Sequence, residues 1–495
     1  MHRPSPPPGG LGRFGEPRPG ASAPAGNGFS RYNRRMQSCC DLAIVGGGAA
    51  GTLAAIHCLQ RARSPLRIVL FEPAPRAGRG VAYATARPEH LLNVPAERMS
   101  AFPARPDDFV DFLAGLPAHA GTARAALAAR YAPRRDYAAY LDARMAEARQ
   151  AAAATLETVA ARVASLERDG DGWAVAWAGG RMRARRVLLA TGNAPRPLPA
   201  RGSGALPRPR LVDAWDYEGV AAIGTDASVC IVGTGLSMVD AVLTLDAAGH
   251  RGRVHLVSRH GLLPQVHAAA HVQDERFDVD ALHGLGTRAR LRRIRAQARD
   301  AAARGLPWQA VMERLRPHVA ALWQSLAPHE QRRFLRHAVR HWDVHRHRIA
   351  PEAHAVLRRL REAGRLQLHC ARLDMVAAGQ RCVQLTLRDR ARRFQALEVD
   401  HVVNATGVEL RVQAMRNPLL EQLLGEGHAL PGAHGIGLAT DADGRLLDAG
   451  GRPQDDLRAI GSLRIGQAWE SIAVPELRVQ AEALARAWVP WGRGA

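Results

Sequence analysis

The sequence predicts an α/β fold in which helices cover parallel sheets, and three observations carry this prediction. Glycine-rich turns begin at Gly46 and Gly233, and each lies between a short apolar strand and a helix. Strand and helix patterns then alternate along the chain, which is typical of parallel sheets. Residues 288–362 have a helical period and predict a helical insertion. Together the patterns predict two dinucleotide-binding Rossmann-type domains, with the insertion in the second.

The predicted elements follow in chain order. The first unit has an apolar strand, the glycine turn, a helix and a second strand, followed by an irregular stretch to about residue 125. A strand before Gly233 opens the second unit, and helices, further strands and a final helix complete the chain. The expected strands are 42–45, 67–71, 172–178, 185–190, 228–232, 366–369, 383–387 and 400–404, and the final helix is 475–488.

Length and composition set the expected domain boundaries. The chain has 495 residues, and single cores usually stop growing near about 250–300 residues. Residues 1–38 hold seven prolines and seven glycines, so this stretch is expected to be a disordered tail. The expected domains are the first dinucleotide domain at 39–222, the second at 223–400 with its insertion at about 270–363, and a return to the first at 401–495.

The chain contains no lysine: its 68 Lys and Arg residues are all arginines, and they stand against 46 acids for a formal charge of +22. Schiff-base enzymes, P-loop NTPases and protein kinases each require a lysine amine at a fixed place, so these classes are excluded. The excess charge permits the binding of anions such as phosphate. No nucleic-acid-binding motif accompanies it, so no nucleic-acid partner is expected.

The six cysteines and the apolar runs indicate a reducing, cytoplasmic compartment. The cysteines form neither a CxxC pair nor a zinc-ligand cluster. No uninterrupted apolar run approaches the roughly 20 residues that span a bilayer. We therefore expect no metal site and no membrane association.

The first glycine motif predicts a dinucleotide site. In Gly46-Gly47-Gly48-Ala49-Ala50-Gly51, the first glycine permits the tight turn, Gly48 lets a pyrophosphate approach, and Gly51 lets helix and strand pack closely. The helix start presents free N–H groups to the phosphates. Glu72 ends the next strand, 21 residues after Gly51, where an acid can bind both ribose hydroxyls. A glycine-rich turn without a ligand is the alternative.

The second glycine motif, Gly233-Thr234-Gly235-Leu236-Ser237-Met238, favours a phosphorylated nucleotide. Its sixth position is Met238, so this helix is expected to lie further from its strand. The following strand ends in Ser258 and Arg259 rather than in an acid. Arginine at this place suits a ribose 2′-phosphate, which indicates NADPH rather than NADH. The alternative is that Arg259 is a solvated surface residue.

A short Ala-Thr-Gly motif occurs twice and links the two units. Ala190-Thr191-Gly192 and Ala405-Thr406-Gly407 each end an apolar strand, where small residues let the chain cross beside a cofactor. This order of motifs indicates a two-dinucleotide flavoprotein with FAD in the first unit and NADPH in the second. Two nucleotides imply hydride transfer to the flavin. Because the cysteines offer no disulfide pair to receive the electrons, a diffusible acceptor is expected, namely O2.

Several further blocks resemble the FAD/NAD(P)-binding family that contains FAD-dependent urate hydroxylase and L-aspartate N-monooxygenase. They are spread over residues 41–485. The blocks are Gly80-Val81-Ala82-Tyr83, His90-Leu91-Leu92-Asn93-Val94-Pro95-Ala96, Pro133-Arg134-Arg135 with Tyr137 and Tyr140, residues 190–195 and 233–240, Trp342-Asp343-Val344-His345-Arg346-His347-Arg348, and Trp469-Glu470 with Ala473-Val474-Pro475-Glu476-Leu477-Arg478.

The resemblance implies an FAD monooxygenase that uses NADPH and O2, with a flavin C4a-(hydro)peroxide as the oxidant. The loop from Gly80 and Val81 to Leu92 and Asn93 would then lie near the isoalloxazine ring. Asn93 would hydrogen-bond the flavin or a substrate amine, with an Asx turn before Pro95 as the alternative.

The C-terminal part of the resemblance concerns the FAD tail and the reduced flavin. Gly461 would approach the FAD tail, although Ser462 stands where many such flavoproteins have an aspartate. The helix that starts at Pro475 would aim N–H groups at the flavin pyrimidine.

Residues 286–348 hold 15 arginines against four acids, a net charge of +11. A solvated helical face is the ordinary explanation. The sharper hypothesis is that Arg346, His347 and Arg348 bind a substrate carboxylate or the NADPH phosphate. His341 and His345 are four residues apart on one helix face, but no third metal ligand stands nearby.

The sequence therefore predicts an FAD- and NADPH-dependent monooxygenase that hydroxylates a small polar nitrogen-containing metabolite. Amine N-hydroxylation and urate-like ring hydroxylation are both compatible with the resemblance. One alternative is a flavin NAD(P)H reductase or oxidase that does not hydroxylate. The other is an FAD-binding redox sensor that does not turn over.

Overall fold

The computed structural model describes residues 39–489. The expected disordered tail at 1–38 lies outside these residues. The α/β fold with parallel sheets and helices is confirmed, and it contains two strand–glycine turn–helix units.

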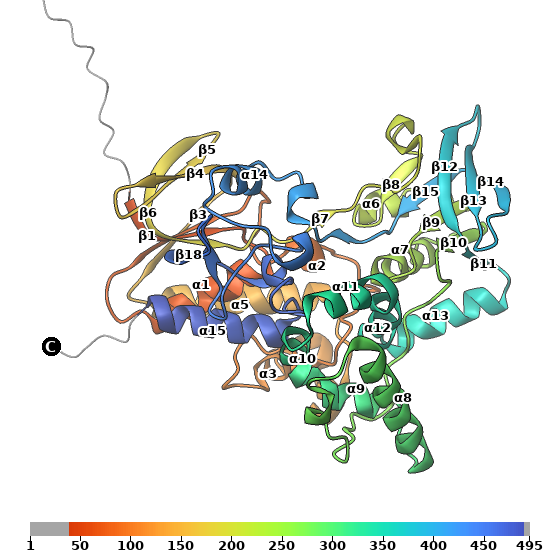
Figure 1. Cartoon of the computed structure of the whole chain (residues 1–495), viewed down its shortest axis with the longest axis horizontal. Helices are drawn as coiled ribbons and strands as arrows, with labels where there is room; N and C mark the ends of the chain where they lie inside the picture. The colour runs from red at the N-terminus through yellow and green to blue at the C-terminus, as the bar shows by residue number, and fades with distance from the viewer. Residues whose placement is uncertain (1–38, 490–495) are drawn as a thin grey trace, which may run out of the picture. The chain divides into compact units, whose positions relative to one another are not determined.

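An eight-stranded sheet forms the core of the first unit, in the order β17-β18-β6-β1-β2-β3 with the β4–β5 hairpin attached to β6 (Figure 1). Its strands are β1 (Cys39–Val45), β2 (Arg67–Phe71), β3 (Thr155–Val159), β4 (Val163–Asp169), β5 (Gly172–Trp177), β6 (Gly180–Leu189), β17 (Arg445–Leu447) and β18 (Pro453–Ala459). Its helices are α1 (Ala49–Arg61), α2 (Gly80–Tyr83), α3 (Asp108–Ala114), α4 (Arg124–Ala129), α5 (Arg134–Ala151), α14 (Pro418–Gly425) and α15 (Val474–Trp488).

Both faces of this sheet are buried. Leu42 and Ile44 of β1 point into the core that α1, α5 and α15 cover, whereas Ala43 and Val45 point into the core on the opposite face. Successive side chains of a strand alternate between faces, so a strand covered on both sides has no polar positions. This burial explains the short continuous apolar run that predicted β1.

The second unit contains a five-stranded parallel sheet in the order β11-β10-β9-β15-β8. A three-stranded antiparallel sheet packs on one face, and α7 and α13 pack on the other. The strands are β8 (Leu211–Asp213), β9 (Val229–Val232), β10 (Val254–Ser258), β11 (Leu366–Cys370), β12 (Arg372–Ala378), β13 (Val383–Arg388), β14 (Phe394–Val399) and β15 (His401–Asn404), and the helices are α6 (Tyr217–Ala221), α7 (Leu236–Ala247) and α13 (Pro351–Glu362).

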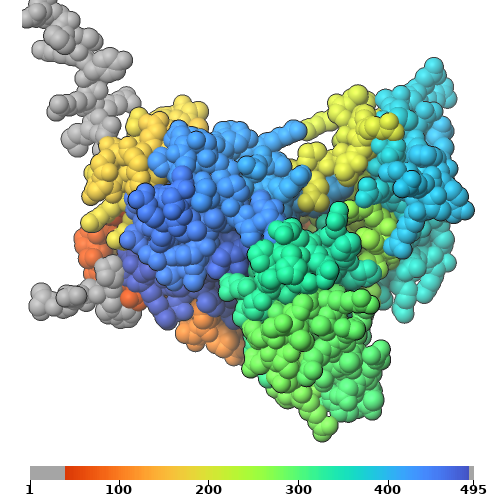
Figure 2. Space-filling model, viewed as in Figure 1, coloured from red at the N-terminus to blue at the C-terminus, as the bar shows by residue number. Residues whose placement is uncertain are grey.

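Five helices between β10 and α13 form the insertion: α8 (Thr287–Ala303), α9 (Gln309–Leu315), α10 (Val319–Gln324), α11 (Pro328–His337) and α12 (Val339–Arg346). Figure 2 shows the teal part of the insertion against the blue C-terminal return. Trp323 and Phe334 share a core there with Ile465 and Trp469, and the Trp323 indole donates to the Gly466 carbonyl at 3.0 Å. The insertion is therefore packed against the first unit as well as attached to the second.

The expected domain boundaries need correction. β8 and β15 belong to the second sheet, although the boundaries at residues 222 and 400 assigned them to the first domain. A short ladder of β7 (Ala194–Pro195) and β16 (Val408–Glu409) marks the crossing between units. The expected insertion extended to residue 363, but α13 packs on α7 and leads into β11 as the crossover helix of the second unit.

Some elements had no counterpart among the predicted ones. The 18-residue helix α5 buries only a narrow stripe, which includes Tyr137, Tyr140 and Leu141, and its remaining positions are mostly charged or alanine. The strands β3 and β14 are largely exposed and lack an apolar run. These elements are fixed by the neighbours on which they pack, which a local pattern does not reveal.

Candidate active site

At the edge of the first sheet, the glycine turn and the Ala190-Thr191-Gly192 segment meet. A Cβ on Gly46, whose φ is 108°, would lie 2.2 Å from the Ala190 carbonyl oxygen. A Cβ on Gly51 would lie 1.9 Å from the Gly46 carbonyl oxygen. Neither glycine can therefore carry a side chain, and Thr191 and Gly192 follow directly beside the turn.

Glu72 and Gly80 complete the rim of this turn. The Gly47 N–H donates to the Glu72 carboxylate at 2.8 Å, and the Ala74 N–H donates to its other oxygen at 2.9 Å. A Cβ on Gly80 would lie 3.2 Å from the Gly48 Cα, so the start of α2 approaches the start of α1 backbone to backbone. The adjacent Val81 is 40% exposed.

Gly461 lies on the opposite side of the helix start. A Cβ on it would lie 3.4 Å from the Ala50 Cβ, and its φ is 72°. The hydroxyl oxygens of Thr191 and Ser462 are buried, and neither has a hydrogen-bond partner within residues 39–489. A bound molecule with polar groups could satisfy both hydroxyls, because buried polar groups are normally paired.

The second unit repeats this geometry. A Cβ on Gly233 would lie 2.2 Å from the Ala405 carbonyl oxygen, so Thr406 and Gly407 follow beside the turn as Thr191 and Gly192 do in the first unit. The Thr406 hydroxyl lies 2.7 Å from the Asn404 side-chain oxygen and ties this crossing together.

Gly235 of the second motif is exposed, whereas Met238 is buried. No heavy atom lies within 4 Å of the place where a Cβ on Gly235 would stand. Leu236 begins α7, and the Ser237 hydroxyl accepts from the Trp215 indole at 3.2 Å. The Thr234 hydroxyl lies 3.0 Å from the Ser258 hydroxyl, and Arg259 is exposed just beyond it.

A charged cavity lies where the first unit meets the insertion. It encloses about 420 Å³ of space outside protein atoms, including the part open to solvent. The lining residues are Asn93, Val94, His267, Arg316, Arg346, His347, Arg348, Glu470, Ile472 and Ala473. Both predicted catalytic residues, Asn93 and Arg348, are therefore brought together.

Asn93 presents its side chain to this cavity. The backbone carbonyl oxygen of Asn93 lies 2.8 Å from Nε2 of His267. Nε2 therefore carries a proton and donates it to this oxygen. Burial, followed by the charge of Arg348, lowers the pKa of His267 to about 4, so the imidazole is neutral. The Asn93 amide makes no hydrogen bond within the described chain, so the alternative Asx turn is not formed. Its neighbour Leu92 is buried in the first core.

Arg348 is 3% exposed, and its guanidinium is ion-paired with Glu313 of α9. Arg98 from the loop after Asn93 pairs with the other oxygen of Glu313 at 2.7 Å. Burial alone would raise the pKa of Glu313, but the charges of Arg98 and Arg348 outweigh it and hold the pKa at about 2. This triad fastens the Asn93 loop to the insertion.

Glu470 was quoted in the family blocks but not predicted as a site residue. Its carboxylate pairs with Arg346 at 2.5 Å and accepts from the Trp342 indole, both on α12. Its φ is 66°, an uncommon conformation for a residue with a side chain. A left-handed glutamate has no sequence signal, so only the structure identifies this position.

Arg316 is the second cavity residue that the sequence did not single out. Its Nε lies 3.6 Å from the Glu476 carboxylate, and its Nη2 is buried without a partner within the described residues. Burial, followed by the charge of Arg346, lowers its pKa, although an arginine stays protonated. Among the many arginines of the segment, no local pattern distinguishes it.

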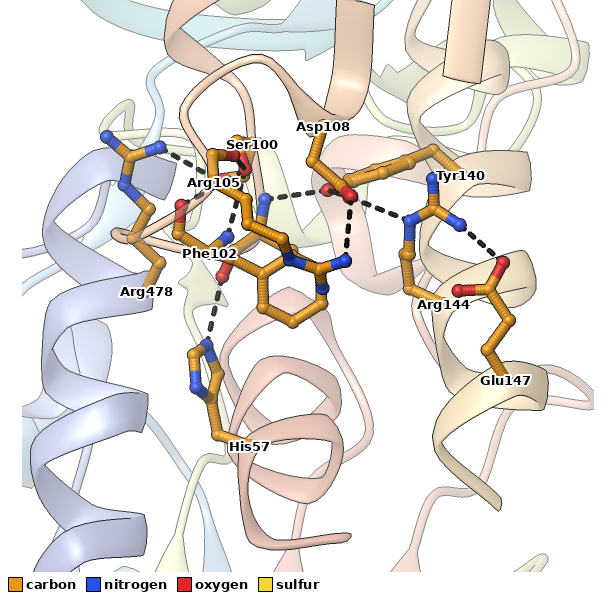
Figure 3. Close-up of polar contacts among 10 residues, drawn as sticks. His57, Ser100, Phe102, Arg105, Asp108, Tyr140, Arg144, Glu147 and Arg478 are labelled. Atoms are coloured by element: carbon orange, nitrogen blue, oxygen red, sulfur yellow. Dashed lines mark hydrogen bonds and ion pairs between the residues drawn. The ribbon is translucent and has the colours of Figure 1, made fainter. Parts of the chain in front are cut away.

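The loop that follows Asn93 is held by a buried hydrogen-bond network (Figure 3). Arg478 of α15 donates to the Ser100 carbonyl at 3.1 Å, and the Ala101 N–H donates to the Tyr140 hydroxyl at 2.9 Å. Tyr140 in turn donates to Asp108 at 2.6 Å. These bonds join α3, α5 and α15 through one loop.

Further contacts in Figure 3 extend this network on both sides. Arg144 donates to Asp108 at 2.7 Å. The His57 ring of α1 binds the Ala101 carbonyl at 2.9 Å, and burial lowers its pKa. The network fixes the loop from which Asn93 reaches the charged cavity and Arg98 reaches Glu313.

Other features contribute less to a candidate site. An apolar cavity lies inside the insertion; Thr287 and Arg290 on its wall are hydrogen-bonded, and the buried Nε1 of Trp469 on the same wall has no partner within residues 39–489. Nδ1 of His345 donates to the His341 carbonyl at 2.7 Å, and within residues 39–489 no three potential ligands are grouped around a metal position. None of the described helices is long and apolar enough to cross a membrane.

Comparisons with known proteins agree with this geometry. Residues 43–194 match the model of the FAD-NAD(P)-binding family. No curated protein sequence matches the chain significantly.

Similar solved structures include ornithine N-hydroxylase from Kutzneria sp. 744, with reduced FAD, NADP⁺ and L-ornithine in its description (TM-score 0.64, 16% identity, 91% of this chain and 99% of that chain). L-lysine 6-monooxygenase from Pseudomonas syringae has a TM-score of 0.63 at 19% identity with the same coverage. Bacillithiol disulfide reductase from Staphylococcus aureus has a TM-score of 0.53 at 12% identity and covers 91% and 98%. The fold is therefore that of two-dinucleotide flavoproteins, and the same fold serves different reactions.

Proposed function

We propose that this protein is an FAD-dependent, NADPH-using monooxygenase that hydroxylates the nitrogen of a small amine carrying an anionic group. The observation that carries the proposal is the charged cavity, which lies where the Asn93 loop and the start of α15 in the first unit meet the end of α12. The similar structures of ornithine, lysine and cadaverine monooxygenases support N-hydroxylation over ring hydroxylation.

The first unit fits FAD. Gly48 and Gly80 leave the start of α1 bare, so a pyrophosphate can approach backbone N–H groups of Ala49 and Ala50. The unpartnered hydroxyls of Thr191 and Ser462 supply hydrogen bonds on either side. Glu72 takes the ribose, exchanging its bonds to backbone N–H groups for bonds from ribose hydroxyls. When bound, FAD supplies the redox centre that accepts hydride and reacts with O2.

The second unit fits NADPH. The open space at Gly235 admits a pyrophosphate, and the α7 start faces it. Ser258 and Arg259 stand at the end of β10, where an acid would repel a 2′-phosphate.

The cavity residues bind and orient the substrate. Of the arginines that line the cavity, Arg346 pairs with Glu470 and Arg348 with Glu313, whereas Arg316 lies 3.6 Å from Glu476. We assign a substrate carboxylate to Arg316, whose Nη2 has no partner. The sequence-based hypothesis named Arg346, His347 and Arg348, but Arg346 already pairs with Glu470 and Arg348 with Glu313.

Asn93 is placed to hold the amine that reacts. Its side-chain oxygen can accept from a neutral or protonated amine, and His267 fixes its backbone. Because His267 is neutral, it adds no charge that would repel a protonated amine. Arg346 and Glu470 also line the cavity, and their ion pair neutralises both buried charges.

The test is NADPH oxidation measured together with oxygen uptake, with and without amino acids, diamines and purines. A faster rate and a hydroxylamine product with one amine support the proposal. Oxidation that yields only hydrogen peroxide with every candidate supports the reductase or oxidase alternative. Flavin that is reduced but never turns over supports the redox sensor.

A further inference from the structure

An arginine cluster surrounds the end of β10. Arg259 at that end lies near Arg372 of β12, Arg340 of α12 and Arg196 of the linker after β7, whose charges lower its pKa after the larger effect of burial. Within residues 39–489, neither Arg259 nor Arg372 forms an ion pair. Arg340 and Arg196 pair with Asp343 at 3.0 Å and Glu409 at 3.8 Å. The cluster therefore has more positive charge than its acids neutralise.

The contacts around the cluster place α12 beside the end of β10. The His260 and His341 rings have centroids 6.0 Å apart, and Arg390 donates to His260 at 3.2 Å. The segment after β10 runs along the end of the same helix, because the Gln265 N–H donates to the Val344 carbonyl at 3.1 Å.

The two ends of α12 thus reach different places. Arg340 and His341 are in its first turn, near β10, whereas Arg346 at its last residue pairs with Glu470 in the charged cavity. Eight helical residues span roughly 12 Å. The helix α12 therefore extends from the ribose end of a bound dinucleotide toward the substrate cavity.

We propose that Arg340 of the insertion completes the binding site for the NADPH 2′-phosphate together with Arg259 and Arg372. The proposal rests on the proposed function, since it deepens the NADPH site. A dianionic phosphate relieves the repulsion among these arginines and competes with Asp343 for Arg340. The insertion then selects the nucleotide with one end of α12 and shapes the substrate cavity with the other.

The experiment measures the dissociation constants of NADP⁺ and NAD⁺ for the FAD-loaded protein by titration calorimetry. Arg340→Gln should raise the dissociation constant of NADP⁺ about tenfold or more, which is the usual effect of losing a hydrogen bond between charged groups. The same substitution should change the dissociation constant of NAD⁺ by less than about twofold, because NAD⁺ has no 2′-phosphate. Arg295→Gln on the exposed face of α8 removes the same charge away from the cluster and should change neither constant.

Asp343→Asn is the second control. It breaks the same ion pair but keeps the arginine, so it should bind NADP⁺ as tightly as the unsubstituted protein or more tightly. The inference is overturned if Arg340→Gln loses affinity for NADP⁺ and NAD⁺ equally, or if its affinity for NADP⁺ does not fall. If the unsubstituted protein binds neither nucleotide, the proposed function fails as well, so the two failures are distinguishable.

Discussion

Arg134 and Asp240 form a bidentate ion pair that joins the two dinucleotide units. Arg134 begins α5 of the first unit, Asp240 lies on α7 of the second, and the two nitrogen–oxygen distances are 2.7 and 3.1 Å. Their side chains are 14% and 8% exposed. Nearby, Nε2 of the His90 ring is hydrogen-bonded to the Thr244 hydroxyl of α7 at 2.8 Å. The pair thus sets how the second unit meets the Asn93 loop.

We predict that Asp240→Asn lowers the free energy of unfolding by about 3 kcal/mol, because it leaves a buried guanidinium without its countercharge. Urea unfolding measures this loss. Arg251→Gln is the matched control: its pair with Asp226 is 69% and 73% exposed, so the change should have little effect on the free energy of unfolding. Equal losses in both variants would mean that the interdomain pair contributes no more than a surface pair.

The two glycine motifs should respond differently to alanine. Gly51→Ala drives a Cβ against the Gly46 carbonyl oxygen, so we predict a protein with little bound FAD and reduced stability. Gly235→Ala meets no protein atom within 4 Å, so the variant should fold and keep its FAD. Its KM for NADPH should rise, because the methyl group occupies the space for the pyrophosphate.

The absorbance spectrum of each purified variant gives the FAD content, and initial rates give the KM. The prediction is wrong if Gly235→Ala loses FAD or if Gly51→Ala retains it.

Glu313 should make stability depend on acid. Its folded pKa of about 2 lies below its usual value of 4.5, so its contribution is complete above pH 4.5 and is lost as pH falls toward 2. The shift corresponds to about 3 kcal/mol. Glu313→Gln should therefore be less stable than the unsubstituted protein at pH 7 and nearly equal to it at about pH 2.

Unfolding curves at several pH values measure this difference. Glu362→Gln, at a side chain 71% exposed, should leave the pH dependence unchanged. A difference between Glu313→Gln and the unsubstituted protein that stays constant with pH would contradict the assigned pKa.

Arg316→Gln should raise the KM for an anionic amine about tenfold or more, because the substrate loses a charge-assisted hydrogen bond. NADPH oxidation in the absence of substrate should be unchanged. Arg332→Gln on the exposed part of α11 is the charge-matched control and should leave the KM unchanged. Steady-state kinetics with the best amine found in the screen provides the measurement, and an unchanged KM in Arg316→Gln would remove Arg316 from the substrate site.

The sequence identified the nucleotide turns because their glycines have local reasons to be there. Gly46 and Gly233 each stand at a strand–turn–helix junction and have φ values of 108° and 107°. The carbonyl oxygens that exclude a Cβ there belong to Ala190 and Ala405, which are distant in sequence. The elements at the boundary between the two units were harder to predict from the sequence. β15 belongs to the second sheet through its pairing with β9 and β8, which are distant in sequence.

The charged cavity could be predicted only in part. Asn93 and Arg348 were singled out, but the partner that neutralises Arg348 is Glu313, which lies 35 residues away in another helix. Arg316 differs from the other described arginines of the segment in having a terminal guanidinium nitrogen, Nη2, that is buried without a partner. Glu470 depends on a left-handed backbone that no residue type announces. Tertiary neighbours, rather than local pattern, decide these roles.

The central claim is that NADPH, O2 and a small amine react at the charged cavity. The most direct test is the ratio of hydroxylamine formed to NADPH oxidised, measured by mass spectrometry and absorbance for the best amine. We expect a ratio near one in the unsubstituted protein and a much lower ratio, with hydrogen peroxide formed in place of the hydroxylamine, for Asn93→Ala. NADPH oxidation that yields peroxide but no hydroxylated product with any amine would contradict the account.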